Sequence, residues 1–405
     1  MSSSRHCPRR VRKSLIEKPF KSLKGLVLGQ LLRNQLAEAS FRVASYLTDP
    51  VCKSHEYYRR VAVVEALHPE ANKAVNVARK FFLLLGLLGF VAVAALTTVP
   101  GIALRYAGAS LQQEPYLYHR SVAVEKTLPP QHTFSLLSWN VCCVGAGYAI
   151  SDGGVLPWDA RIERIVERIL AQDADVNCLY ETFDFRAAFY IQQRLLAHGY
   201  AHCYFNIGPR AVGVNSGILV ASKYRIHNPE FTTFPVETLV GRTKGATKGV
   251  FAFDLQSEGG SFARVFATHL QHSEECMHAT PDEQAARAAQ MQIIVEKIRA
   301  VMGRCVVVTG DLNLDDAEYR ASNWQHLFQK GDRYHDPVRT WGGDAFCAAL
   351  VGKRASTPLN LDHTMMLRDS GRALSTALVD VGYNAHLFTR EALSDHAGLR
   401  SQITV

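Results

Sequence analysis

Five short polar motifs, each following or ending an apolar run, constrain the fold of this 405-residue chain more than any other feature. In chain order, the motifs are Ser138–Asn140, Tyr180–Glu181, Thr268–Leu270, Gly310–Asn313 and Ser394–His396. Strand-like runs such as Phe134–Leu137 and Val306–Val308 come just before them. Polar groups at the ends of several strands can converge on one point, so the motifs predict an α/β domain with one site at the ends of its strands.

The pattern of apolar residues after position 132 alternates between strand-like and helix-like spacing. Strands are expected at about 134–139, 176–180, 201–205, 214–221, 249–255, 262–268, 304–309 and 362–367. Helical spacing recurs between some of these runs, at Ile162–Ile169, Phe189–Leu196 and Met291–Val301. Strands interleaved with helices on this scale indicate a layered α/β domain over residues 132–405.

The side chains in the motifs are those that a metal-assisted phosphodiester cleavage needs. Glu181 is the main candidate ligand for Mg²⁺, or Mn²⁺ in its place, because hard cations prefer carboxylate oxygen. Asn140 is expected to bind the metal or a phosphoryl oxygen through its neutral amide. Asp311 and Asn313 alternate with Leu312, so an extended backbone would point both to one face. The motifs therefore predict a magnesium site beside a phosphate-binding site.

Histidines supply the proton-transfer groups of this predicted site. His396 has the pKa range for proton transfer near neutral pH, and its neighbour Asp395 is a further candidate metal ligand. Whether His396 acts as a base toward water or as an acid toward the leaving oxygen stays open. Histidines outside the motifs, among them His272 and His363, are expected on the surface or in loops.

An uncharged run from Phe81 to Leu104 is the second informative feature. As a helix this run would be about 36 Å long, which is enough to cross a bilayer. Arg79 and Lys80 end it on one side and Arg105 on the other. The alternative, a buried core helix, fits less well because such helices are rarely apolar on every face over this length. The run predicts a transmembrane or membrane-embedded helix at 81–104.

Positive charge is concentrated before this run. Residues 1–80 hold sixteen basic and six acidic residues, a net charge of +10, whereas the remainder of the chain has a net charge of −2. A duplex-binding catalytic domain usually carries its own basic surface, so no nucleic acid partner is expected. The basic segment suits anionic lipid instead. Helical spacing from Leu28 to Leu47 fits either an interfacial amphipathic helix or an ordinary small helix, and residues 105–131 are expected to form a juxtamembrane connector.

Taken in this order, the five motifs resemble the endonuclease/exonuclease/phosphatase superfamily, and the resemblance covers about residues 132–405. Finer matches are similar to the neutral sphingomyelinases within it, namely Tyr180–Ala188, Asn215–Gly217, Ala221–Tyr224 and Ala246–Gly249. The resemblance implies a four-layer α/β sandwich, in which two packed β-sheets are flanked by helices. A hydrophobic N-terminal region and a connector precede the catalytic domain in that family as well.

The resemblance also implies residue roles. Asp311 would orient or deprotonate the attacking water, and Asn313 would hold a phosphate oxygen. Asp362 would hold the ring of His396, and His269 would donate to the phosphoryl oxygens as negative charge develops. For two further residues the resemblance implies substrate contact: Lys248 and Asn215. Thr243 stands where the mammalian membrane-bound enzymes carry a regulatory Asp five residues before the matching Lys, so an Asp–Lys ion pair cannot form here.

These features together predict a membrane-anchored, Mg²⁺-dependent phosphodiesterase that hydrolyses sphingomyelin to ceramide and phosphocholine, with a sphingomyelin-containing membrane as its partner. A phosphoinositide phosphatase or nuclease with the same core, and a catalytically silent membrane scaffold, remain alternatives. The side of the membrane stays open. The positive-inside tendency would place residues 105–405 across the membrane from residues 1–80, whereas the resembling family keeps its catalytic domain on the cytosolic face.

Overall fold

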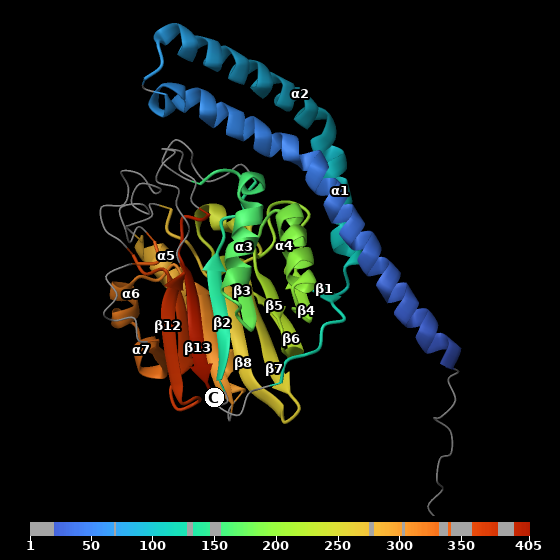
Figure 1. Cartoon of the computed structure of the whole chain (residues 1–405), viewed down its shortest axis with the longest axis vertical. Coiled ribbons are helices and arrows are strands. Elements are labelled where there is room, and N and C mark those ends of the chain that lie inside the picture. Colours follow the sequence, from blue (N-terminus) through green and yellow to red (C-terminus); the bar gives the residue numbers. More distant parts are fainter. Residues whose placement is uncertain are drawn as a thin grey trace, which may run out of the picture.

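The computed structural model describes nine stretches of the chain: 20–68, 70–127, 133–145, 155–274, 279–301, 304–331, 339–341, 359–379 and 393–405. A β-sandwich with flanking helices forms its body, and a pair of long helices leans against one side (Figure 1). All residues before Phe20, the prolines at 129 and 130, and His278, His335 and His386 lie outside the described residues.

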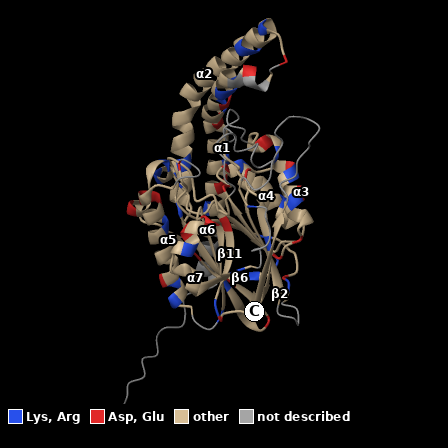
Figure 2. Cartoon of the chain, turned by 90° about the vertical axis from the view of Figure 1, so that its left-hand side faces the viewer, with Lys and Arg blue, Asp and Glu red and all other residues tan. Residues whose placement is uncertain are grey.

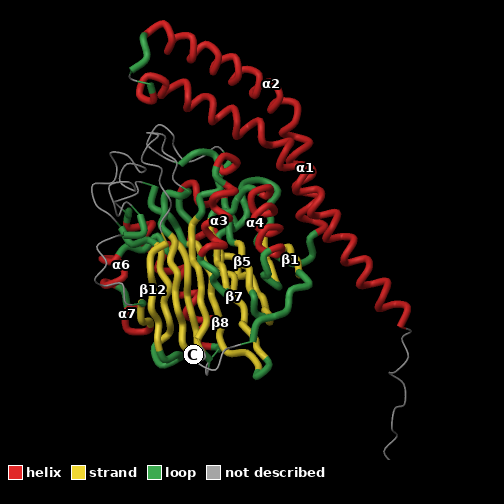
Figure 3. Tube along the Cα trace, in the orientation of Figure 1, coloured by secondary structure: helices red, strands yellow, loops and turns green. Residues whose placement is uncertain are grey.

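Two packed sheets make up the sandwich (Figure 3). Within the described ranges the first sheet has seven strands in the order β1-β4-β5-β3-β2-β13-β12, and the second has six in the order β10-β11-β9-β8-β7-β6. The strands of the first sheet are β1 (Leu117–Arg120), β2 (Thr133–Asn140), β3 (Val176–Tyr180), β4 (His202–Phe205), β5 (Leu219–Ser222), β12 (Ala373–Val379) and β13 (Gly398–Thr404). Those of the second are β6 (Arg225–Thr233), β7 (Gly249–Ser257), β8 (Gly260–His269), β9 (Cys305–Asp311), β10 (Phe328–Lys330) and β11 (Asp362–Leu367).

Each sheet contains one parallel pair near its centre. Strand β2 runs parallel to β3, with Asn140 opposite Tyr180, and β8 runs parallel to β9, with His269 opposite Asp311. Both strands of a parallel pair end at the same edge of the sheet, so the polar residues at their carboxyl ends lie side by side. This register places the predicted site residues together.

Three apolar clusters define four layers. The middle cluster fills the space between the sheets and includes Tyr180, Phe253 and Val307. A second cluster packs the outer face of the first sheet against helices α3 (Ile162–Ala171) and α4 (Phe185–Ala197). A third packs the second sheet against α5 (Pro281–Arg299). Helices therefore cover both sheets from outside, which confirms the predicted four-layer sandwich. The short helices α6 (Asp316–Ala321) and α7 (Trp324–Leu327) follow β9.

Helices α1 (Phe20–Leu67) and α2 (Lys73–Leu111) form an antiparallel hairpin that extends beyond the sandwich (Figure 1). Close contact between them depends on glycine: a Cβ at Gly101 would lie 2.7 Å from Thr48 Cγ2, and one at Gly108 would lie 3.1 Å from the Phe41 ring. The hairpin also joins the body, since Phe41 stacks on Phe185 at 5.6 Å. The uncharged run lies inside α2, and Figure 2 shows it as a long stretch without charged residues.

The structure confirms most predicted elements and corrects some. The predicted strand at 214–221 is shorter, because the backbone is irregular until Leu219. Helix α5 begins ten residues before the predicted Met291, at a capping box formed by Thr280 and Glu283. Strands β6, β12 and β13 were not predicted, because polar residues interrupt the apolar runs by which the other strands were recognised. Strand β1 lies within the predicted connector and pairs with β4.

Candidate active site

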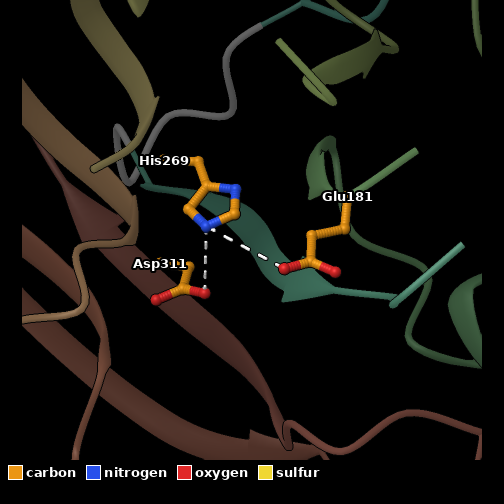
Figure 4. Close-up of side chains that lie close together, drawn as sticks. All are labelled: Glu181, His269 and Asp311. Atoms are coloured by element: carbon orange, nitrogen blue, oxygen red, sulfur yellow. Dashed lines mark ion pairs between the residues drawn. The ribbon is translucent and has the colours of Figure 1, made fainter. Parts of the chain in front are cut away.

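The candidate site lies where the parallel pairs of both sheets end. Asn140 is the last residue of β2, and Glu181 directly follows β3 in the same sheet. His269 is the last residue of β8, and Asp311 is the last residue of β9 in the facing sheet. Figure 4 shows Glu181, His269 and Asp311 with their side chains directed toward one another. The site therefore takes its residues from both sheets.

Glu181, His269 and Asp311 form one of two groups of side chains in the described part of the protein that could hold a metal ion, the other being Asp311, Asp362 and His396. His269 Nε2 lies 4.0 Å from Glu181 Oε1 and 3.5 Å from Asp311 Oδ2, and one ligand atom from each residue lies within 4.8 Å of the others. Asp395 lines the same pocket. Carboxylate oxygens gathered in this way fit a hard divalent cation.

The electrostatics of Glu181 support this fit. Burial, with a contribution from the Asp395 charge, raises the pKa of Glu181 to about 7. The protein alone therefore stabilises the ionised carboxylate of Glu181 poorly. A bound cation would stabilise this carboxylate. The backbone of Glu181 has φ +58°, and the adjacent Gly217 has φ +72°. A Cβ at Gly217 would lie 3.1 Å from the Glu181 Cα, so a glycine is needed for this turn.

Asn140 faces Asp311. Its Nδ2 donates to Asp311 Oδ2 at 2.9 Å, and its Oδ1 accepts from the Cys142 backbone N–H at 3.0 Å. The amide oxygen predicted to bind a metal therefore already accepts a backbone hydrogen bond. This arrangement orients the Asp311 carboxylate through the Asn140 amide.

His396 and Asp362 form a hydrogen-bonded pair next to Asp311. His396 Nδ1 lies 2.7 Å from Asp362 Oδ2, and its Nε2 lies 3.8 Å from Asp311 Oδ2. Burial opposes protonation of the ring, but the charges of Asp362, Asp311 and Asp395 raise the pKa of His396 well above its usual range. These carboxylates therefore favour the protonated form of the His396 ring beside Asp311.

Asn313 reaches the pocket by a turn rather than by an extended strand. Strand β9 ends at Asp311, and Asn313 adopts φ +51°, so the premise of an extended backbone through Asn313 was wrong. Asp311 Oδ1 accepts from the Asn313 N–H at 3.0 Å, which closes the turn. Asp311 and Asn313 both line the pocket, while Leu312 is fully buried in the core.

Lys248 and Asn215 differ in their distance from the chemistry. Lys248 is buried, its Nζ donates to the Leu270 carbonyl at 3.1 Å, and burial lowers its pKa to about 8 against the opposing effect of the Glu181 and Asp311 charges. Asn215 instead donates to Asn206 Oδ1 at 2.9 Å. It lines a separate cavity between the sandwich and α1, not the pocket of Glu181.

The pocket has a volume of about 110 Å³ and includes residues that the motifs did not indicate. Arg287 is fully buried, forms two hydrogen bonds to Glu318 at 2.9 and 2.6 Å, and donates to the Gln271 carbonyl. Trp341 pairs with His396 through a β-bridge. His272 also faces the pocket. Arg287, Trp341 and His272 belong to no motif. The sequence shows only that they follow β8 or lie in the last third of the chain, and this does not identify them as site residues.

One expectation about a residue near the site was wrong. His363 is not a surface residue: it lies in β11, is buried, and its Nε2 is 2.6 Å from the Leu314 carbonyl oxygen. The two carboxylates that follow Leu314 also have partners. Asp315 caps α6 by accepting from the Glu318 N–H, and Asp316 accepts from Asn360 at 2.7 Å and pairs with Lys330.

Comparison with known proteins identifies the family. The model of the Endonuclease/Exonuclease/phosphatase family matches residues 137–396, which is well over half of the chain and contains every residue of the pocket. The chain belongs to the endonuclease/exonuclease/phosphatase family. Members of this family are hydrolases of phosphate esters, so the family supports a hydrolase that uses a divalent cation.

Within the endonuclease/exonuclease/phosphatase family, the chain is similar to sphingomyelin phosphodiesterase 5 of Danio rerio, with 26% identity over 235 residues. That match covers 52% of this chain and 41% of the relative, so the chain matches less than half of the relative's length.

Solved structures share the fold at lower identity. SmcL has a TM-score of 0.54 at 19% identity and covers 67% of this chain and 99% of its own. A Staphylococcus aureus beta toxin with bound magnesium ions has a TM-score of 0.52 at 19% identity and covers 66% and 98%. A humanized D. rerio TDP2 has a TM-score of 0.51 at 16% identity and covers 68% and 100%. These likenesses show the fold alone.

Proposed function

We propose that the protein is a membrane-associated phosphodiesterase that hydrolyses sphingomyelin to ceramide and phosphocholine with the help of Mg²⁺. One observation carries this proposal. The stretch Tyr180–Ala188 resembles neutral sphingomyelinases. It contains Glu181 near its start, and near its end it contacts the helical hairpin. Arg186 of this stretch pairs with Asp49 of α1 at 2.6 Å and with Asp184 at 2.8 Å. The same stretch therefore carries the candidate metal ligand and binds the apolar hairpin. An active site held next to an apolar surface suits a substrate that lies in a membrane, such as a lipid.

The residues divide the chemistry among them. Glu181, with Asp395 and Asp311 nearby, would hold the cation, which when bound supplies a Lewis acid for the phosphoryl oxygens. Asp311 accepts the proton of the attacking water, since Asn140 and Asn313 fix both of its oxygens. His396, protonated and held by Asp362, gives a proton to the leaving ceramide oxygen. His269 donates to a phosphoryl oxygen as its charge grows.

The hairpin supports association with one face of a membrane rather than crossing. Helix α2 has large apolar side chains exposed along its length, including Phe82 and Leu88 at 69% and 65% exposure. Its partner α1 carries Lys53, Glu56 and Arg60 close to Tyr57, which packs on Phe90 in the middle of the uncharged run. Crossing would bring these charges to the bilayer centre at a cost of about 3 kcal/mol each. We therefore propose that the hairpin enters the membrane without crossing.

Phosphocholine release from sphingomyelin vesicles tests the activity. Wild-type protein should release it with Mg²⁺ and not with a chelator, and Glu181→Ala and His396→Ala should abolish release. Phosphoinositide and DNA substrates are assayed in parallel, because a TDP2 shares the fold. Turnover of either substrate without sphingomyelin hydrolysis would replace the proposed substrate, and inertness on all three would favour a scaffold.

Protease protection tests the membrane arrangement. With tags at the two chain ends in sealed vesicles, both tags should be cleaved from the same side. Protection of one end tag alone would show that α2 crosses by itself, and a tag in the turn between α1 and α2 that is accessible only from the opposite side would show that the whole hairpin crosses.

A further inference from the structure

His272 has no motif behind it, yet it lies in the pocket. It follows β8 by three residues and lines the same cavity as His269 and Glu181. Its ring is close to the Thr243 hydroxyl: Nδ1 and Thr243 Oγ1 are 2.8 Å apart. Thr243 belongs to the short 3₁₀ helix Gly241–Gly245 and is buried.

The hydrogen bonds around Thr243 determine which nitrogen of His272 carries the proton. Gln271 is oriented by the Val240 N–H, which donates to its Oε1 at 3.0 Å. Its Nε2 therefore donates, and one of its acceptors is Thr243 Oγ1 at 2.9 Å. A threonine hydroxyl has one proton to give. Among the described residues, His272 Nδ1 is the acceptor within reach of it, and the reverse assignment would leave a buried hydroxyl proton without a partner. The proton of the imidazole then resides on Nε2.

A neutral His272 ring carries one N–H proton, which the hydrogen bonds above place on Nε2. Burial and the charge of Lys248 lower the pKa of His272 to about 4. With Nδ1 occupied by Thr243, the Nε2–H is the donor that remains. No residue in the described part of the chain accepts a hydrogen bond from it. The ring that carries this unpaired N–H lines the pocket together with His269.

We propose that His272 Nε2–H donates a hydrogen bond to a phosphoryl oxygen of the bound phosphodiester, and that Thr243 is the positioning residue that fixes its tautomer. The inference rests on the proposed function. In a phosphocholine head group the phosphate oxygens are the acceptors, because a quaternary ammonium has neither a lone pair nor an N–H. A neutral donor holds such an oxygen without competing with the cation at Glu181.

Substitutions at His272 test the contact. His272→Leu removes the donor, whereas His272→Gln keeps an amide N–H at a similar reach. The exposed His326→Leu on α7 is the matched control. Against bis(4-nitrophenyl) phosphate and sphingomyelin, His272→Leu should lower kcat/KM about 10- to 100-fold, as expected for a lost bond to a charged group. His272→Gln should restore most of it. Equal losses in the Leu and Gln variants, or none in either, would overturn the proposal.

A spectroscopic measurement tests the tautomer without turnover. In full-length protein with ¹⁵N-labelled histidine, NMR should report a neutral His272 with its proton on Nε2, and Thr243→Val should reduce that population. A proton on Nδ1 in the wild type would overturn the proposal. Failure of the proposed function can be told apart from failure of the His272 contact. If the wild type cleaves bis(4-nitrophenyl) phosphate but not sphingomyelin, the proposed substrate is refuted. The His272 variants, measured with bis(4-nitrophenyl) phosphate, still test the contact.

Discussion

Arg186 of the sandwich lies 2.6 Å from Asp49 of α1, and the same guanidinium holds Asp184, the cap of α4, three residues after Glu181. The hairpin is thus bonded to the turn that presents the main candidate metal ligand. Tyr46 and Trp158 rings flank the guanidinium at 5.3 Å each. Contact between the hairpin and the sandwich therefore bears on the geometry of the site.

Asp49→Asn tests this link. The change leaves the partly buried Arg186 with one carboxylate instead of two, so we expect a loss of about 1–3 kcal/mol and a Tm lower by several degrees. Mg²⁺ affinity, measured by calorimetry, should fall as well. Asp159→Asn is the control, because it removes a second ion pair between α1 and the sandwich, to Lys53, in which Asp159 is 51% exposed. Equal effects of the two variants would contradict a special role for Asp49.

Glu181→Gln should change stability with a definite pH dependence. The folded pKa of Glu181, about 7, lies above the unfolded value, so the folded state binds the extra proton between about pH 4.5 and 7. Glu181 therefore contributes its full stabilisation below about pH 4.5, and this contribution is lost as the pH rises from about 4.5 to 7. At pH 8 without metal, Glu181→Gln should therefore be more stable than wild type by about 1–2 kcal/mol. Thermal unfolding at pH 5 and pH 8 measures this.

Adding Mg²⁺ should reverse the order of the two proteins. Wild type gains stability from the bound ion, whereas Glu181→Gln gains little because a neutral amide is a poorer ligand. An equal gain in Tm for both would show that the ion is held elsewhere.

Two glycines of α2 should respond with opposite signs. A Cβ at Gly89 meets nothing within 4 Å, so Gly89→Ala should stabilise the helix by up to about 1 kcal/mol. At Gly101 the added methyl would press on Thr48 and Leu47, and Gly101→Ala should destabilise the hairpin by about 1–3 kcal/mol. Proteolysis rates of the hairpin in detergent compare the two. Stabilisation by both would mean that α2 does not pack on α1 here.

The outer face of α2 should determine vesicle binding. Phe82→Ser and Leu88→Ser remove large exposed apolar side chains, each of which would contribute about 1.5–3 kcal/mol on entering lipid. Each variant should weaken binding to sphingomyelin vesicles about 10-fold or more in a flotation assay. Val122→Ser, at a fully exposed position outside the hairpin, should bind as wild type does.

Asp362→Asn should separate catalysis from metal binding. The amide no longer stabilises a charged His396 ring, so the proton for the leaving oxygen is lost and kcat should fall about 10²- to 10⁴-fold. Mg²⁺ affinity should change little. A matching loss of metal affinity would place Asp362 among the ligands instead.

The sequence was sufficient for the features that depend on local pattern. Apolar runs such as Val306–Val308 form buried strands, and the motif at their ends marks where the chain leaves the sheet. The uncharged run at 81–104 is helical because nothing in it breaks a helix except Pro100, which α2 accommodates. Glu181 and Asp311 could be placed in one site because they end strands.

Features that depend on distant partners escaped the sequence. His363 was expected at the surface or in a loop although 362–367 was predicted as a strand. Its burial comes from the place of β11 between β9 and β10 in the sheet, which the sequence of β11 alone does not show. Arg287 carries no motif, and its place in the pocket follows from its bonds to Glu318 and Gln271. Asn313 reached the expected face through a left-handed turn that an alternation rule does not describe.

The division of the site between two sheets links activity to the integrity of the whole sandwich. Glu181 stands on one sheet and Asp311 on the other, and among the described residues no disulfide or hairpin joins β3 to β9. A small shift of one sheet relative to the other would separate Glu181 from Asp311 before any strand unfolds. Loss of turnover on heating then serves as an early gauge of the cohesion between the layers, ahead of any spectroscopic sign of melting.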